Sequence, residues 1–206
     1  MTESRFMLAH TLRLLYRSGV VAPIRPDRLV GMARALMRFG MTAASAYAAG
    51  AARHPDHPAL VDEHGVLTYT EVDQRTDRLA RALADRRIGP DTRVAVLCRN
   101  HRGPVEVITA CAKVGADVVL LNTGMSAEQL GAVLVEQNAD LLIADQDFDR
   151  YLEFVPARCS RALAWVPDEA ATTSAGLPTV ESMIREGGRA TLPSRPPLGK
   201  LIVLTS

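Results

Sequence analysis

Residues 93–98 read Arg-Val-Ala-Val-Leu-Cys, a short and almost continuously apolar run. Two similar runs follow, Asp-Val-Val-Leu-Leu at 117–121 and Ala-Asp-Leu-Leu-Ile-Ala at 139–144. Short apolar runs without polar alternation are typical of strands that are buried on both faces of a parallel sheet. The three runs therefore predict the centre of such a sheet.

Helices are expected between these strands. The helical pattern of residues 105–114 stops at Gly115, and Ser126 with Gln129 has the spacing of a capping box that opens a helix reaching Asn138. Strands that alternate with helices indicate right-handed βαβ units. We therefore expect an α/β fold with a mostly parallel, helix-covered sheet.

The segment before the sheet predicts a hairpin and a well-defined helix. Strand-like residues 59–62 and 66–69 flank a turn at 63–65. Thr68 and Glu71 again have the spacing of a capping box. After this capping box, apolar and small side chains recur on one helical face: Val72, Thr76, Leu79 and Leu83.

The first 44 residues are interpreted as a basic helical extension, and residues 45–206 as the domain itself. Residues 1–40 contain seven arginines against Glu3 and Asp27, so they carry a charge of +5 in a chain whose net charge is +1. An amphipathic helix is expected at residues 5–17.

A second helix is expected from Pro26 or Asp27 to about Ala51, with Asp27 capping its first turn. Its apolar residues Leu29, Ala33, Leu36 and Met37 form one stripe. We expect both helices to pack on the globular body. The alternative is a peripheral contact of residues 5–40 with an anionic membrane surface.

Composition excludes several classes of protein. The chain has 206 residues, 48% of them hydrophobic and 23% charged, which is typical of a folded domain, and its small net charge predicts no nucleic-acid partner. Cys98, Cys111 and Cys159 are odd in number and lack Cys-x-x-Cys spacing, so we expect reduced thiols and a cytoplasmic protein. No secretory signal is expected, since His10 and Arg13 interrupt the apolar run at residues 6–16 and no small-residue cleavage site follows. No transmembrane helix is expected, since Arg34 and Arg38 interrupt the longest weakly apolar stretch.

The usual nucleotide-binding loops are missing. No Gly-x-Gly-x-x-Gly follows a strand, which disfavours a Rossmann dehydrogenase. Gly199-Lys200 is not a Walker A loop, because Ser194 and Leu201 stand where the first glycine and the final hydroxyl residue are required. A P-loop ATPase is disfavoured for the same reason.

Metal ligands and nucleophiles are also not indicated. His54 and His57 have His-x-x-His spacing, but they flank a turn without a third ligand, so we expect surface histidines and no metal site. Cys98 and Cys111 are expected to be small core residues. We assign no catalytic residue in the chain.

After Asp145 the pattern is weaker. A strand is expected at residues 161–166, a loop at 168–176, a short helix at 180–185 and a connector at 187–200. The chain then reads Leu-Ile-Val-Leu-Thr-Ser at residues 201–206, which predicts a strand that ends in two hydroxyl residues.

Four ordered motifs resemble the adenylate-forming enzymes. Residues 67–72, Leu-Thr-Tyr-Thr-Glu-Val, resemble their Leu-Thr-Tyr-x-Glu-Leu motif, and residues 54–60 are similar to their Pro-Asp-x-Pro-Ala segment. Residues 112–122 resemble their Lys-x-Gly-Ala-x-x-x-Pro-Leu-Asn segment, except that Leu120 replaces the frequent proline. Residues 202–206 resemble the strand that enters the family's phosphate loop.

The resemblance implies the first part of the N-terminal domain of a fatty-acyl-CoA ligase. Such an enzyme uses ATP and Mg²⁺ to convert a fatty acid into an acyl-adenylate, and CoA then takes the acyl group. Thr205 and Ser206 match the start of the loop that binds the ATP phosphates. The remaining matched motifs imply scaffold residues.

We expect a truncated ligase that is inactive alone, because the glycine-rich loop and the later motifs do not occur in residues 1–206. The alternative is a noncatalytic folded module that pairs with a separately encoded C-terminal remainder in trans or with a membrane surface. An unrelated flavodoxin-like binding domain is a third interpretation, although no ligand loop supports it.

Overall fold

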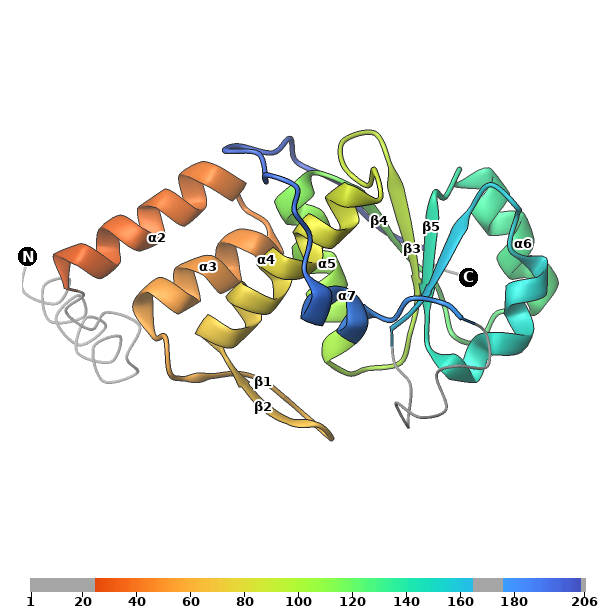
Figure 1. Ribbon diagram of the computed structural model, residues 1–206, viewed down its shortest axis with the longest axis horizontal. Coiled ribbons are helices and arrows are strands. Elements are labelled where there is room, and N and C mark those ends of the chain that lie inside the picture. Colours follow the sequence, from red (N-terminus) through yellow and green to blue (C-terminus); the bar gives the residue numbers. More distant parts are fainter. Residues whose placement is uncertain (1–24, 165–175, 205–206) are drawn as a thin grey trace, which may run out of the picture.

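The computed structural model describes residues 25–164 and 176–204 and contains a five-stranded parallel sheet (Figure 1). The strand order is β6-β5-β3-β4-β7. The strands are β3 (Arg93–Leu97), β4 (Asp117–Leu120), β5 (Leu141–Ala144), β6 (Ser160–Leu163) and β7 (Leu201–Val203). All four pairings are parallel, which confirms the predicted α/β fold and its three central strands.

Helices cover both faces of this sheet. One face packs against α4 (Tyr69–Asp85), α5 (Arg102–Val114) and α7 (Val180–Glu186). The other face packs against α6 (Ala127–Glu136) and the 3₁₀ helix η1 (Gln146–Phe154). Outside these layers lie α2 (Pro26–Phe39), α3 (Ala43–Arg53) and the antiparallel hairpin of β1 (Pro58–Asp62) and β2 (Gly65–Thr68).

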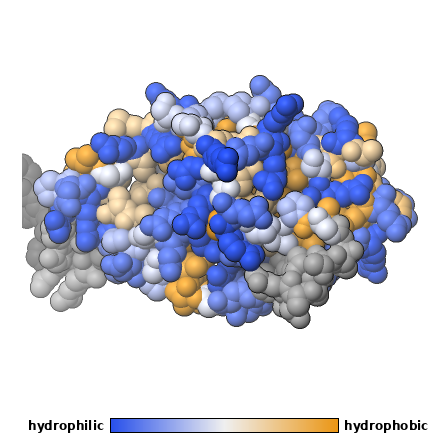
Figure 2. Space-filling model, viewed as in Figure 1, coloured by the Kyte–Doolittle hydropathy of each residue, from blue (hydrophilic) through white to orange (hydrophobic). Residues whose placement is uncertain are grey.

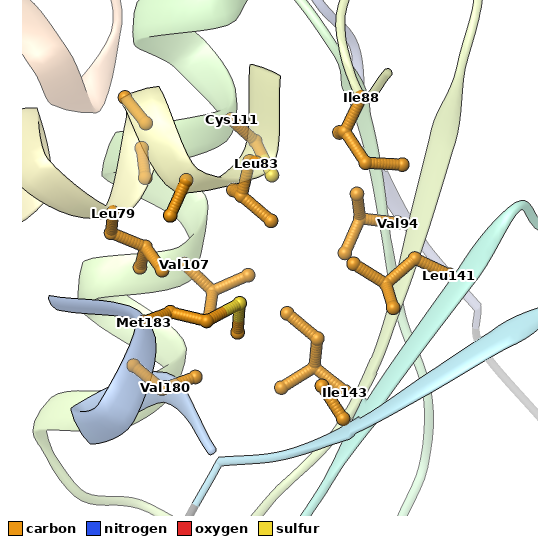
Figure 3. Packing of buried hydrophobic residues seen from close by; sticks show 14 of the residues in the cluster. Leu79, Leu83, Ile88, Val94, Val107, Cys111, Leu141, Ile143, Val180 and Met183 are labelled. Carbon is orange, nitrogen blue, oxygen red and sulfur yellow. The ribbon is translucent and has the colours of Figure 1, made fainter. Parts of the chain in front are cut away.

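The central strand β3 contributes alternate residues to two separate cores. Val94 and Val96 belong to the core beneath α4, α5 and α7, and Figure 3 shows Val94 facing Leu83 and Val107 across this layer. Ala95 and Leu97 belong to the core beneath α6 and η1. Because both sets are buried, polar residues are excluded from positions 94–97, which explains the apolar run after Arg93.

Local capping chemistry sets the helix starts that the sequence predicts. The Glu71 carboxylate accepts from the Thr68 backbone N–H at 2.7 Å, while the Thr68 hydroxyl accepts from Glu71 N–H at 3.3 Å. Ser126 and Gln129 make the same reciprocal pair at the start of α6. The four side chains predicted to share a face of α4 are fully buried: Val72, Thr76, Leu79 and Leu83. The capping boxes and the hairpin are therefore confirmed.

The single helix expected from residue 26 to about 51 is wrong. The chain forms α2 and α3 instead, because Gly40 adopts φ +61°, a left-handed conformation that ends a helix. Thr42 and Ser45 then form a new capping box that opens α3. Asp27 does not cap α2; its carboxylate accepts from Arg25 Nε at 3.2 Å instead.

The predicted contact face of α2 is also wrong. The side chains of Leu29, Ala33, Leu36 and Met37 are exposed rather than packed on the body. α2 contacts α3 through its opposite side, where Ala35 and Phe39 are buried. The helix expected at residues 5–17 lies outside the described residues.

The remaining boundaries differ in smaller ways. α5 starts at Arg102, three residues earlier than expected, because the His101 side chain caps it. The η1 helix was not predicted. A strand was expected at residues 161–166, and among the described residues β6 spans Ser160–Leu163. The short helix near residue 180 and the last strand are confirmed. Most of the loop expected at 168–176 lies outside the described residues.

None of the helices among residues 25–164 and 176–204 is both long enough and apolar enough to cross a membrane.

A buried lysine joins two of the helices. Lys113 of α5 is 0% exposed, and its ammonium donates to Asp73 Oδ1 at 2.7 Å and to Asp77 Oδ1 at 2.6 Å, both on α4. It also donates to the Asp73 backbone carbonyl at 2.8 Å. The ammonium is thus fully hydrogen-bonded at the point where α4 and α5 pack.

Replacing Lys113 with alanine should destabilise the fold strongly. The change removes a buried cation and leaves Asp73 and Asp77 without their shared partner, for which we expect a loss of about 3 kcal/mol in the free energy of unfolding. Urea unfolding followed by circular dichroism measures this loss.

Arg99→Ala is the matched control, because it removes an ion pair with Asp147 at 3.0 Å in which both side chains are exposed. We expect this control to change stability by less than about 1 kcal/mol. Equal losses in the two variants would contradict the anchoring role of Lys113.

Candidate active site at the carboxyl edge of the sheet

The carboxyl ends of β3 and β5 lie side by side where the chain reverses its direction across the sheet. From β3 the crossover leads to β4 on one side, and from β5 it leads to β6 on the other. In open α/β sheets, ligands bind in the crevice outside the carboxyl ends of strands at such a switch point. A functional site is therefore expected at this edge.

A buried histidine and aspartate occupy the switch point. His101 Nε2 lies 2.9 Å from Asp145 Oδ1, and each side chain is 4% exposed. The other carboxylate oxygen of Asp145 accepts from the Arg99 backbone N–H at 2.7 Å. Asp145 thus links the loop after β3 to the end of β5.

The hydrogen bonds of His101 indicate which of its two ring nitrogens carries the proton. Gly103 N–H donates to His101 Nδ1 at 3.0 Å, so Nδ1 is an acceptor and Nε2 carries the proton that it donates to Asp145. Gly103 is required for this close approach, because a Cβ at this position would lie 2.6 Å from His101 Cε1. The ring is therefore fixed as the cap of α5 and as the partner of Asp145.

Cys98 completes this cluster. Its thiol donates to the Ile143 carbonyl at 3.6 Å, and its sulfur, a His101 ring nitrogen and an Asp145 oxygen lie within 4.8 Å of one another. Burial, together with the negative charge of Asp145, raises the pKa of the Cys98 thiol well above its usual range. The thiol is therefore protonated at neutral pH and is a poor nucleophile.

The cluster has the residue types of a metal site, but the tautomer of His101 does not suit a metal ligand. A metal ion would need the Cys98 thiolate and an unprotonated His101 Nε2. Moving the ring proton to Nδ1 would direct two N–H groups at each other, since Gly103 N–H faces Nδ1. The arrangement therefore supports a hydrogen-bonded link between strands rather than a cation site.

The two histidines with His-x-x-His spacing lie elsewhere. The rings of His54 and His57 contact each other at a tilt of 38°, with centroids 4.7 Å apart. Within the described ranges, this pair belongs to no group of three potential metal ligands.

A second part of the same edge is formed by β4 and β7. The loop after β4 is held by Asn122, whose side-chain oxygen accepts from Gly124 N–H at 2.9 Å. Leu204 N–H lies 3.4 Å from the Leu120 carbonyl, so the last described residue is at the carboxyl end of β4. Thr205 and Ser206, the predicted phosphate-binding residues, lie outside the described residues.

The sequence interpretation missed His101 and Asp145. A usable signal was present, because Asp145 directly follows a buried strand and His101 directly precedes a helix. In a parallel sheet, such positions meet at one edge. Cys98 was expected to be a small core residue; its side chain is only partly buried, although it packs against the core beneath α4, α5 and α7.

Comparison with known proteins identifies relatives of this chain. A family model described as AMP-binding enzyme matches residues 47–196. The chain is 30% identical over 107 residues to the fatty acid–[acyl-carrier-protein] ligase ScoC of Streptomyces coeruleorubidus. It is 34% identical over 117 residues to a feruloyl-CoA synthase of an Amycolatopsis species.

The chain spans only part of these relatives. The two alignments cover 52% and 56% of this chain but 21% and 23% of the relatives. Among solved structures, it is similar to a putative long-chain-fatty-acid CoA ligase from Rhodopseudomonas palustris CGA009, with a TM-score of 0.64 and 23% identity. That match covers 77% of this chain and 39% of the other, and it shows a shared fold.

Asp145→Asn should make the Cys98 thiol more reactive. The substitution removes the negative charge beside the sulfur while keeping an oxygen that can accept from Arg99 N–H, so the pKa of Cys98 should fall. Each unit of decrease raises the thiolate fraction roughly tenfold. Alkylation by iodoacetamide between pH 8 and 10, followed by peptide mass spectrometry, measures the rate.

Cys111 is an internal control, because burial alone raises the pKa of its thiol to about 12. Its alkylation should be unchanged in the variant. If both cysteines became reactive together, the effect would be a general loosening of the fold and not the loss of the Asp145 charge.

Proposed function

The chain belongs to the AMP-binding enzyme family, and we propose that it provides the first part of the N-terminal domain of an acyl-CoA ligase. The reaction would join a fatty acid to CoA through an acyl-adenylate, at the expense of ATP. The observation that carries this proposal is the family match over residues 47–196, together with a parallel sheet whose last strand ends at the carboxyl edge. The fatty-acid substrate is inferred from the relatives' names and from the motifs at residues 67–72 and 112–122.

Thr205 and Ser206 are the residues that we assign to ATP. β7 pairs with β4 in parallel, so the chain leaves Leu204 in the direction of the carboxyl edge. Two hydroxyl groups after such a strand can donate to phosphate oxygens. When bound, Mg²⁺ would neutralise part of the phosphate charge.

We propose further that residues 1–206 do not catalyse adenylation by themselves. Charge that develops on a transferring phosphoryl group needs several preorganised donors and cations. The sequence contains no glycine-rich phosphate loop after any strand, and the described part of the carboxyl edge is occupied by the uncharged Cys98 thiol and the paired His101 and Asp145. A C-terminal remainder, in the same chain or in trans, would have to supply the missing groups.

The exposed edge of the sheet favours the second candidate function, a folded module that pairs with a separate remainder. Leu201 and Val203 are 54% and 61% exposed on β7, which is an edge strand. An uncovered apolar edge of this kind is a surface for a further strand or helix. The cytoplasmic location expected from the three unpaired cysteines is part of the same proposal.

ATP–pyrophosphate exchange tests whether the chain is inactive by itself. With ATP, Mg²⁺ and a fatty acid, the purified 206-residue chain should give no exchange above background, because the phosphate-binding groups are incomplete. Robust exchange by this chain alone would refute the proposal.

Co-expression with a polypeptide that begins with Gly-[Ser/Thr]-Thr-Gly and continues as the remainder of the family domain should restore exchange. In that complex, Thr205→Ala combined with Ser206→Ala should lower the exchange rate by about tenfold or more, since two donors to phosphate are lost. Ser194→Ala, an exposed hydroxyl on the connector, is the matched control and should have no effect. Equal rates in all three proteins would remove Thr205 and Ser206 from the ATP site.

A further inference from the structure

α2 has two apolar faces, and only one of them is packed. Its inner face carries Ala35 and Phe39, which are 6% and 4% exposed. Gly31 also lies on this face, where an added Cβ would approach Ala52 Cβ of α3 to 2.8 Å. α2 therefore packs closely on α3 along this side.

The outer face of α2 carries the apolar residues that the fold leaves in solvent. With about 100° between successive residues of a helix, Leu29, Ala33, Leu36 and Met37 lie on the side opposite Ala35. The larger side chains of this face are strongly exposed: Leu29 55%, Val30 60%, Leu36 45% and Met37 67%, followed by Met41 at 92% just past the helix. We call this set the outer face of α2.

Arginines lie along both borders of the outer face. On the helical projection, Arg25 is next to Leu29 on one side and Arg34 is next to Val30 on the other. Residues 25–41 contain four arginines against one aspartate, Asp27. In Figure 2, hydrophilic and hydrophobic atoms lie side by side at the end of the molecule that α2 occupies in Figure 1.

We propose that the outer face of α2 docks on an anionic lipid bilayer, with the helix lying in the plane of the surface. An exposed apolar stripe bordered by arginines matches the two parts of such a surface, acyl chains below and negative headgroups around. α2 has 14 residues, long enough to lie about 20 Å along the surface. It lies at one end of the described part of the molecule, opposite the end that α6 occupies (Figure 1).

Charge disfavours two other occupants. Arg28 and Arg38 donate to the backbone carbonyls of Arg53 and Pro193, away from the stripe, so the bordering arginines are Arg25 and Arg34. A second copy would bring this pair opposite its own duplicate around the same stripe. Residues 1–24 carry three arginines against Glu3, so this segment also repels the arginines of α2. An anionic surface is the partner that attracts them. This inference does not depend on the proposed ligase activity.

Vesicle sedimentation tests the proposal with the full 206-residue chain. The chain should bind vesicles of phosphatidylglycerol and phosphatidylcholine in equal parts, and it should bind pure phosphatidylcholine vesicles much more weakly. Leu29→Ser combined with Val30→Ser and Met37→Ser should lower the partition coefficient by about tenfold or more. Arg34→Gln should lower it roughly fivefold on anionic vesicles only.

Val61→Ser combined with Val66→Ser is the matched control, because these side chains of the hairpin are 74% and 54% exposed. Circular dichroism and thermal melting should be unchanged in all variants, since the substituted side chains are exposed. Binding that survives the α2 triple variant, or that falls equally in the hairpin control, would overturn the proposal. No binding of the wild-type chain to anionic vesicles, or a concentration-dependent dimer that only the triple variant abolishes, would overturn it as well.

Discussion

The burial of β3 on both faces is the constraint on which the rest of the structure depends. A central parallel strand can pair its backbone only with other strands, and its side chains need apolar cover above and below. Val94 and Val96 enter one core while Ala95 and Leu97 enter the other. Helices must then cross on both faces, and the parallel pairing places the carboxyl ends of all five strands at one edge. That edge holds the His101–Asp145 pair and the end of β7.

The features that the sequence predicts well are local ones. The capping boxes at Thr68 and Ser126, the hairpin and the apolar strands depend on residues within a few positions of each other. The interaction of Lys113 with Asp73 and Asp77 and the pair of His101 with Asp145 join residues 36 to 44 positions apart, and only the folded chain reveals them. The face of α2 was mispredicted for a related reason: helical spacing tells which side chains share a face, but not which face is covered. The alanine-rich sequence after Gly40 favours a continuous helix, but the positive φ of Gly40 is incompatible with one, so the helix ends there.

The described residues mainly hold the fold together. Asp145, His101 and Cys98 satisfy each other and the neighbouring backbone, and Lys113 fixes α5 to α4. The residues that we assign to ATP come only after the last strand. In the function that we propose, the scaffold precedes the phosphate-binding residues along the chain. The proposed membrane contact of the outer face of α2 is separate from the proposed reaction.

Amide hydrogen exchange of the 206-residue chain, measured residue by residue by NMR, tests whether this stretch folds as a sheet with two buried faces. We expect the slowest exchange at the paired amides of β3 and β5, such as those of Ala95, Val96, Leu142 and Ile143, which should open only with global unfolding. The exposed edge strand β7 should exchange faster. Rapid exchange throughout β3 and β5, no slower than in the connector at residues 187–200, would show that the sheet does not fold in this way.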